Sequence, residues 1–130
     1  MRILFVCRHN KFRSKVAEAI FHSLQSGIEV KSAGVVKDLD PFVEEGLVEL
    51  LVRQGYQVVS EQSQMVSDQL LAWADKIVIV ADDVSSQGFP AGKVERWEIK
   101  DAHDGDPLRK KVIAEIEWKV KELVKAKGLK

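Results

Sequence analysis

The chain begins with the sequence MRILFVCRHNKFRS, residues 1–14, and the expected fold is built around this segment. Residues 3–6 are apolar and β-prone, and they are followed by Cys7, the only cysteine of the chain. From Lys15 onward the apolar residues recur at helical spacing, at Val16, Ile20 and Leu24. The pattern predicts a buried strand, a tight loop and the start of a helix.

A loop that leads into a helix has chemical consequences. The first turn of a helix presents unpaired N–H groups and a positive dipole end, so it is suited to an oxyanion. The reactive nucleophile of a cysteine is its thiolate, and a helix start beside cationic groups is where reactive cysteines occur, so we expect Cys7 to be the nucleophile. Arg13 offers a planar fork of donors that matches two phosphate oxygens, and Ser14 is placed to hydrogen-bond the sulfur or a loop amide.

A buried structural cysteine is the alternative reading, because free cysteine often behaves as a small hydrophobe. The neighbours of Cys7 argue against it, since they are polar or cationic: Arg8, His9, Lys11, Arg13 and Lys15.

The segment VCRHNKFRSKVAEA, residues 6–19, resembles the signature loop of the low-molecular-weight protein tyrosine phosphatases and the related arsenate reductases. Residues 32–34 (Ser-Ala-Gly) and 74–80 are similar to further family segments, and Asp101 stands where the family carries its acid. The resemblance implies that Cys7, Arg13 and Asp101 are catalytic. It also implies that the phosphate-binding residues are Arg8, His9, Asn10, Lys11, Phe12, Arg13 and Ser14.

Length and composition indicate one domain, residues 1–130, with 45% hydrophobic and 31% charged residues. Twenty basic and twenty acidic residues balance, which argues against a nucleic-acid or membrane surface. A single cysteine excludes an intramolecular disulfide and fits a reducing cytosol. With no signal peptide or membrane-spanning segment in the sequence, we expect a cytoplasmic protein, and we expect it to be a monomer.

The rest of the chain alternates strands with helices. Strands are expected at residues 28–34, 76–80 and 94–99, and the nearly continuous apolar run of 76–80 is typical of a central parallel strand. Helices are expected from Asp40-Pro41 to Gly55, after Ser67, and from Asp106-Pro107 to Gly128. A right-handed crossover makes the first two strands parallel neighbours. These elements predict a three-layer α/β/α domain with a doubly wound, mostly parallel four-stranded sheet.

Three aspartates compete for the role of general acid. Asp106 precedes proline, as the family's acid does, but capping of the final helix explains it fully. Asp101 follows a strand at the sheet edge where the loops converge, so we prefer it to Asp104 and Asp106. In the family a proline follows the acid, whereas Ala102 follows it here.

Other departures bear on the substrate. His9 stands where the family commonly has glycine, and histidine tolerates left-handed backbone better than most residues. Lys11 occupies a wall position that is apolar in typical tyrosine phosphatases, which favours an acidic phosphosubstrate. Phe12 stands where many members have a second cysteine, so the usual internal oxidation partner is missing.

The sequence therefore predicts a phosphomonoester hydrolase, acting on phosphotyrosine in a protein or on a small aryl phosphate through a phosphocysteine intermediate. Inorganic phosphate would be its product and inhibitor. No cofactor or metal is expected, because no convincing ligand cluster is present. The alternatives are an arsenate reductase that uses external thiols, a phosphocarrier, which lacks the arginine supplied here by Arg13, and a non-catalytic phosphate-binding module. Phosphoarginine and small phosphate esters stay open as substrates.

Overall fold

A computed structural model describes residues 1–25, 27–103 and 105–126. Its centre is a four-stranded sheet, β1 (Arg2–Cys7), β2 (Glu29–Gly34), β3 (Lys76–Val80) and β4 (Val94–Trp97), in the order β2-β1-β3-β4. All three strand pairs are parallel. The chain runs outward from β1 in one direction to β2 and in the other to β3 and β4, so the predicted doubly wound sheet is confirmed. The switch point lies between β1 and β3, where such sheets bind ligands at their carboxyl ends.

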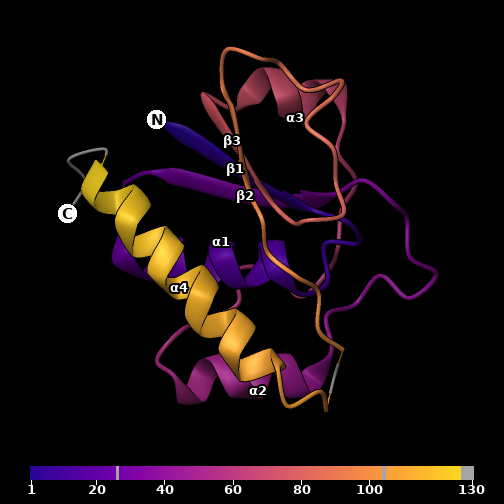
Figure 1. Cartoon of the computed structure of the whole chain (residues 1–130), viewed down its shortest axis with the longest axis vertical. Helices are drawn as coiled ribbons and strands as arrows, with labels where there is room; N and C mark the ends of the chain where they lie inside the picture. Colours follow the sequence, from indigo (N-terminus) through magenta and orange to yellow (C-terminus); the bar gives the residue numbers. More distant parts are fainter. Residues whose placement is uncertain (26, 104, 127–130) are drawn as a thin grey trace.

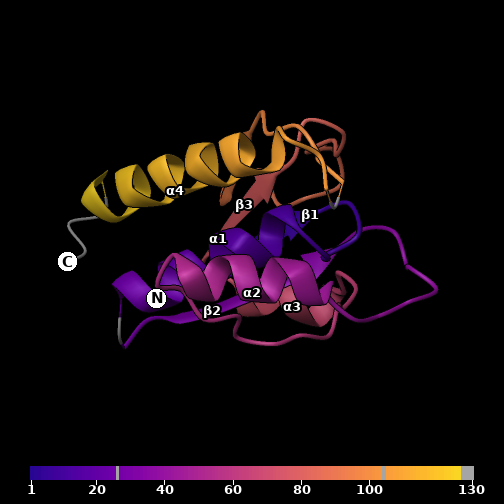
Figure 2. The same ribbon diagram turned by 90° about the horizontal axis from the view of Figure 1, so that it is seen from below.

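Helices cover both faces of this sheet (Figures 1 and 2). The larger layer contains α1 (Arg13–Leu24), α2 (Glu45–Arg53) and α4 (Arg109–Ala126), and α3 (Asp68–Trp73) lies on the other face. The N-terminus of α3 is capped as predicted, because the Ser67 side chain accepts a hydrogen bond from the Leu70 N–H.

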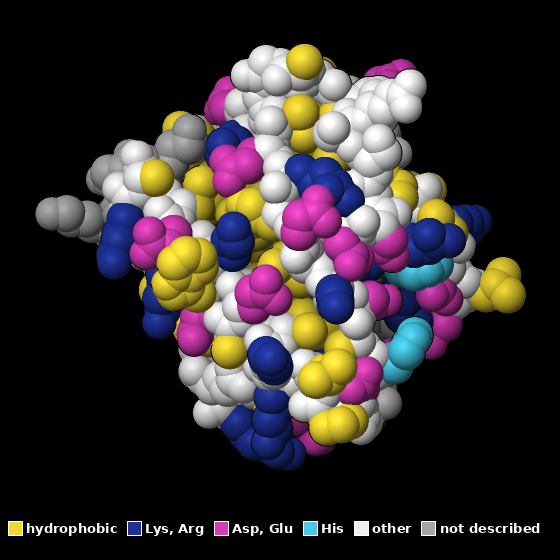
Figure 3. Space-filling view, viewed as in Figure 1, with side chains coloured by type: hydrophobic (Ala, Val, Ile, Leu, Met, Phe, Trp, Pro, Cys, Tyr) yellow, Lys and Arg dark blue, Asp and Glu magenta, His cyan; other side chains and the backbone are white. Residues whose placement is uncertain are grey.

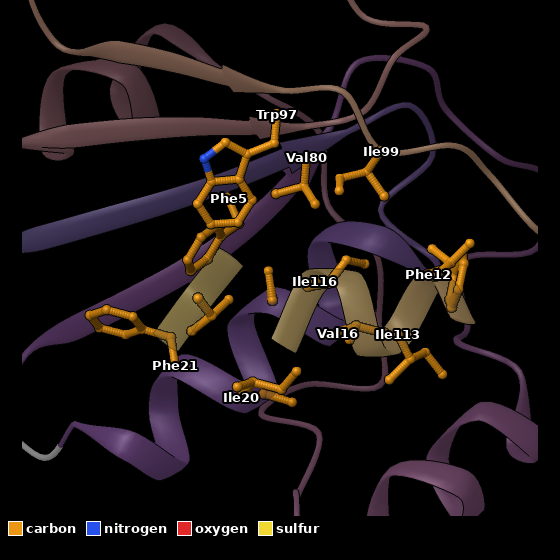
Figure 4. Close-up of a cluster of buried hydrophobic side chains, with 14 of the residues drawn as sticks. Phe5, Phe12, Val16, Ile20, Phe21, Val80, Trp97, Ile99, Ile113 and Ile116 are labelled. Carbon is orange, nitrogen blue, oxygen red and sulfur yellow. The ribbon is translucent and has the colours of Figure 1, made fainter. Parts of the chain in front are cut away.

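Successive strand residues point to opposite faces, and both faces are buried. Ile3 and Phe5 of β1 join the core under α1, α2 and α4, whereas Leu4 and Val6 join the smaller core under α3. Phe5 contacts the rings of Phe21 and Trp97 at centroid distances of 6.0 Å each (Figure 4). The continuous apolar run of β1 therefore reflects two cores rather than one.

The second helix begins later than the sequence suggests. The Asp40-Pro41 pair predicts a start at residue 40, but α2 begins at Glu45. Asp40 accepts a hydrogen bond from the Phe42 N–H, and Phe42 forms an antiparallel bridge with Gln62. This pairing with a remote segment keeps residues 41–43 extended, so the predicted boundary was wrong.

The ends of the last two elements also differ in detail. β4 stops at Trp97, because the Ile99 N–H turns back to the Trp97 carbonyl at 2.9 Å. The last helix begins at Arg109 and not directly at the predicted Asp106-Pro107 pair; Asp106 accepts a hydrogen bond from the Leu108 N–H at 2.8 Å in the turn that leads into it. Gly128, the predicted end of the last helix, lies outside the described residues. Within the described ranges, the structure has no helix that is both long enough and apolar enough to span a membrane.

Candidate active site

The loop of residues 8–12 connects β1 to α1 at the switch point of the sheet. The Arg8 carbonyl accepts hydrogen bonds from the Val35 and Val36 N–H groups at 2.9 and 2.8 Å, so the end of β2 supports the loop. Among the described residues, no side chain caps the start of α1 at Phe12. The loop thus lies where the first-turn N–H groups of a helix favour an anion.

A chain of hydrogen bonds leads from the sulfur into the loop. The Cys7 Sγ lies 3.0 Å from the Ser14 Oγ, and the Asn10 side-chain amide donates to the same hydroxyl at 2.7 Å. The Asn10 Oδ1 accepts from the Gln64 N–H at 2.9 Å. Asn10 is fully buried and has a positive φ of 57°, a conformation that asparagine tolerates better than most residues. These contacts fix the loop around Cys7.

Arg13 is held by groups from two other segments, the residues that follow β3 and those that follow β4. It is only 2% exposed, and one guanidinium nitrogen donates to the Ile99 carbonyl at 2.9 Å. A second nitrogen lies 2.9 Å from Asp83, and longer ion pairs of 3.6 Å join the guanidinium to Asp82 and Asp101. A guanidinium fixed in this way needs little reordering when an oxyanion binds.

Two of the three candidate acids lie among the described residues, and their surroundings differ. Asp101 lines the same cleft as Cys7 and Arg13, and its carboxylate accepts a hydrogen bond from the Ala102 N–H at 3.0 Å. Asp106 accepts from the Leu108 N–H in the turn before α4 and is not among the residues that line the cleft. Asp104 lies outside the described residues. Geometry therefore places Asp101, and not Asp106, beside the sulfur-bearing loop.

The cleft has a volume of about 230 Å³. Of the predicted phosphate-binding residues, His9, Lys11, Phe12 and Arg13 line it. Arg8, Asn10 and Ser14 do not: Arg8 is exposed, while Asn10 and Ser14 are buried behind the loop. Histidine side chains gather with acidic and basic ones at the right-hand edge of the molecule in Figure 3, the edge at which the loops converge in Figure 1.

The site contains further residues that were not predicted from the sequence: besides Asp38, they include two pairs of charged residues. Asp82 and Asp83 contact Arg13, and their signal is their position directly after the buried strand β3. Arg109 and Glu44 line the cleft from α4 and from the residue before α2, and they form an ion pair at 2.8 Å. Nothing in the spacing of the sequence marks these last two, since 64 residues separate them.

A buried charged pair lies on α1 beneath the loop. The Lys15 ammonium donates to the Gln62 carbonyl at 2.8 Å and lies 4.0 Å from the Glu18 carboxylate, which accepts from the Ser32 hydroxyl at 2.7 Å. Burial lowers the pKa of Lys15, although the charges of Glu18 and Cys7 act in the opposite direction. Burial likewise raises the pKa of Glu18. Through Lys15, this pair attaches the first turn of α1 to residues 62–64, whose backbone also binds the Asn10 side chain.

Fold and cleft together define a class of protein: an α/β domain with a cysteine and an arginine beside a helix N-terminus at the switch point of its sheet, an arrangement suited to an oxyanion. The sequence model of the family described as low molecular weight phosphotyrosine protein phosphatase matches residues 2–130. The chain belongs to this family, which confirms the predicted family and supports its phosphatase function.

Individual relatives agree with the assignment. A protein-arginine-phosphatase of Geobacillus stearothermophilus is 30% identical over 112 residues, covering 81% of this chain and 75% of the relative. The crystal structure of an arsenate reductase from Archaeoglobus fulgidus is similar with a TM-score of 0.80 and 37% identity, covering 94% of this chain and 98% of that one. A low molecular weight protein tyrosine phosphatase from T. tengcongensis has a TM-score of 0.82 and 26% identity, covering 97% and 99%.

Proposed function

We propose that the protein hydrolyses phosphotyrosine, in a protein or as a small aryl phosphate, through a phosphocysteine intermediate. The observation that carries the proposal is the presence of Cys7, Arg13 and Asp101 in one cleft, beside a loop at the start of a helix. Each residue type matches one requirement of the reaction: a nucleophile, an oxyanion clamp and a proton donor.

In the first step the Cys7 sulfur attacks phosphorus and the bond to the phenolic oxygen breaks. Asp101 gives its proton to the departing oxygen, while Arg13 and the loop N–H groups hold the equatorial oxygens. In the second step the Asp101 carboxylate takes a proton from water, the water oxygen attacks phosphorus and the sulfur–phosphorus bond breaks. Ser14 stabilises the departing thiolate through the contact of 3.0 Å with the sulfur. Inorganic phosphate leaves as the product and, through the same contacts, is an inhibitor.

Steady-state kinetics on phenyl phosphate test this assignment. Cys7→Ser should abolish turnover, and residual activity would point to another site. Asp101→Ala should lower kcat by about 10²- to 10⁴-fold, because a positioned acid contributes on that order. Asp106→Ala is the matched control: it removes the hydrogen bond to the Leu108 N–H ahead of α4, costs about 1 kcal/mol of stability and should leave kcat nearly unchanged. The reverse ranking would overturn the role proposed for Asp101.

A second candidate is reduction of arsenate, and the similarity to the arsenate reductase of A. fulgidus favours it. Arsenate is a phosphate mimic, so Cys7 would form an arsenic–sulfur bond in the same loop. The chain has one cysteine, so two external thiols would be needed: the first attacks the Cys7 sulfur, which releases arsenite and leaves a mixed disulfide, and the second reduces that disulfide and returns Cys7 to the thiol. Measuring arsenite formation with added thiols and phosphatase turnover on the same sample separates the two functions.

The proposed environment follows from the chemistry of the nucleophile. A reaction that needs a free thiolate requires reducing surroundings, so we place the protein in the cytoplasm. We also propose that it acts as a monomer.

A further inference from the structure

The wall of the cleft that would face the leaving group is charged rather than apolar. Apart from Cys7, its apolar lining residues are Phe12 and Ala102, counted over the described part of the chain. The Arg109 guanidinium lies over the Phe12 ring at 4.3 Å from the centroid, so one face of that ring is already covered. A bare phenyl ring finds little apolar surface here.

Two cations reach this wall from different elements. Lys11 comes from the loop, with 18% of its side chain exposed. Arg109 comes from the first residue of α4 and is 6% exposed. The stacking on Phe12 and the 2.8 Å contact with Glu44 fix the orientation of the Arg109 guanidinium. The loop and the helix thus bring two positive charges to one cleft.

Three carboxylates that pair with these cations are more exposed than the cations. Lys11 lies 3.8 Å from Asp38 and 3.7 Å from Asp40, distances of ion pairs rather than of direct hydrogen bonds. The carboxylate side chains are 30% exposed for Asp38, 68% for Asp40 and 39% for Glu44. Water screens exposed charges more strongly than buried ones, so these partners only partly cancel the cations.

We propose that Lys11 and Arg109 determine specificity by favouring aryl phosphates whose organic part carries carboxylates next to the ester, as in a phosphotyrosine flanked by glutamates. The same charges disfavour phosphoarginine, whose guanidinium would face two cations. This inference rests on the proposed phosphatase function and names the substrate class within it.

The test uses three phosphotyrosine peptides that differ only in the flanking residues, glutamate, alanine or lysine, so that the leaving group stays the same. In low salt, kcat/KM should be about five-fold higher for the glutamate peptide than for the alanine peptide, and lowest for the lysine peptide. Phosphoarginine should be the poorest substrate. Equal values for all three peptides, or a preference for phosphoarginine, would overturn the inference while leaving the phosphatase function intact.

Two pairs of variants with opposite expected effects on the glutamate-to-alanine ratio of kcat/KM distinguish substrate recognition from a structural role of these side chains. Lys11→Met and Arg109→Met should reduce the glutamate-to-alanine ratio toward one. Asp38→Asn and Glu44→Gln remove a competing carboxylate and should raise the ratio. A merely structural role would move total activity in all four variants without changing the ratio, which would contradict the proposal. If the unaltered protein hydrolyses none of the three peptides, the phosphatase function itself is rejected.

Discussion

Arg13 shows how a single side chain can be both buried and ready to bind. Three aspartates and a backbone carbonyl surround its guanidinium, and they come from the segments after β3 and β4. A buried cation without such partners would be costly. These contacts therefore keep the charge in place and set the direction of the planar fork before any substrate arrives.

Replacing this guanidinium by an ammonium tests the importance of the fork. Arg13→Lys keeps the positive charge but loses the planar pair of donors, so kcat/KM should fall by about 10²-fold or more and inhibition by phosphate should weaken. Arg8→Lys is the matched control, because Arg8 is exposed and supports the loop through its backbone. Equal losses in both variants would show that local charge, not fork geometry, matters.

The sequence was sufficient to place Cys7 and Arg13 in one loop, because residues six apart in a strand–loop–helix unit stay close whatever the rest of the chain does. It was not sufficient for Asp83 or Arg109, whose roles depend on how distant segments pack. Asp101 lies between these cases: its position after a strand predicted the sheet edge, but only the folded chain brings it beside Arg13.

At the scale of elements, the loop depends on the close approach of β2 to its backbone. A Cβ added at Gly34 would lie 2.7 Å from the His9 carbonyl carbon and 2.8 Å from the Asn10 nitrogen, closer than real Cβ contacts come. The predicted strand ending at Gly34 is therefore also a support for the phosphate loop.

Gly34→Ala should push the loop away from β2, lowering both the melting temperature and kcat/KM. Gly92→Ala is the control, since a Cβ there meets nothing within 4 Å and Gly92 has no positive φ. Thermal unfolding followed by circular dichroism, with kinetics on the same samples, measures both effects. A Gly34→Ala variant as stable and active as the control would contradict this role of the close approach.

The sequence predicted element boundaries correctly where they depend on neighbouring residues and incorrectly where they depend on distant ones. The apolar run of β3 gave its bounds, and Ser67 gave the start of α3, since both depend on neighbouring residues. The start of α2 was misplaced because residues 41–43 pair with residues 61–63, which no local signal at Asp40-Pro41 reveals.

At the scale of the whole molecule, α4 packs against α1 and connects the C-terminal part of the chain to the site. Tyr56, just after α2, donates a hydrogen bond from its hydroxyl to the Glu117 carboxylate in the middle of α4. Burial, the hydrogen bond to Glu117 and the charge of that carboxylate raise the pKa of Tyr56 to about 12. This contact links the residues just after α2 to α4, which lies in the same helical layer.

The chain has a single tyrosine, so its ionisation can be followed by absorbance. The native midpoint should lie near pH 12, and it should fall to about 10 in denaturant. Because the folded pKa is raised, the stabilisation is fully present below pH 10 and is lost as the pH rises toward 12. Tyr56→Phe should lower the free energy of unfolding by about 1 kcal/mol at pH 8, measured in urea. A native midpoint near 10 would argue against the contact.

In the proposed mechanism the phosphoryl group is carried by the Cys7 sulfur, and trapping the phosphocysteine intermediate is a direct test of this step. In Asp101→Ala, p-nitrophenyl phosphate needs little acid assistance to phosphorylate the sulfur, but hydrolysis lacks its base, so the intermediate should accumulate. After an acid quench, mass spectrometry should find one phosphoryl group on the peptide that contains Cys7. Continued turnover with no phosphoryl group on that peptide, or with the group on another residue, would contradict the account.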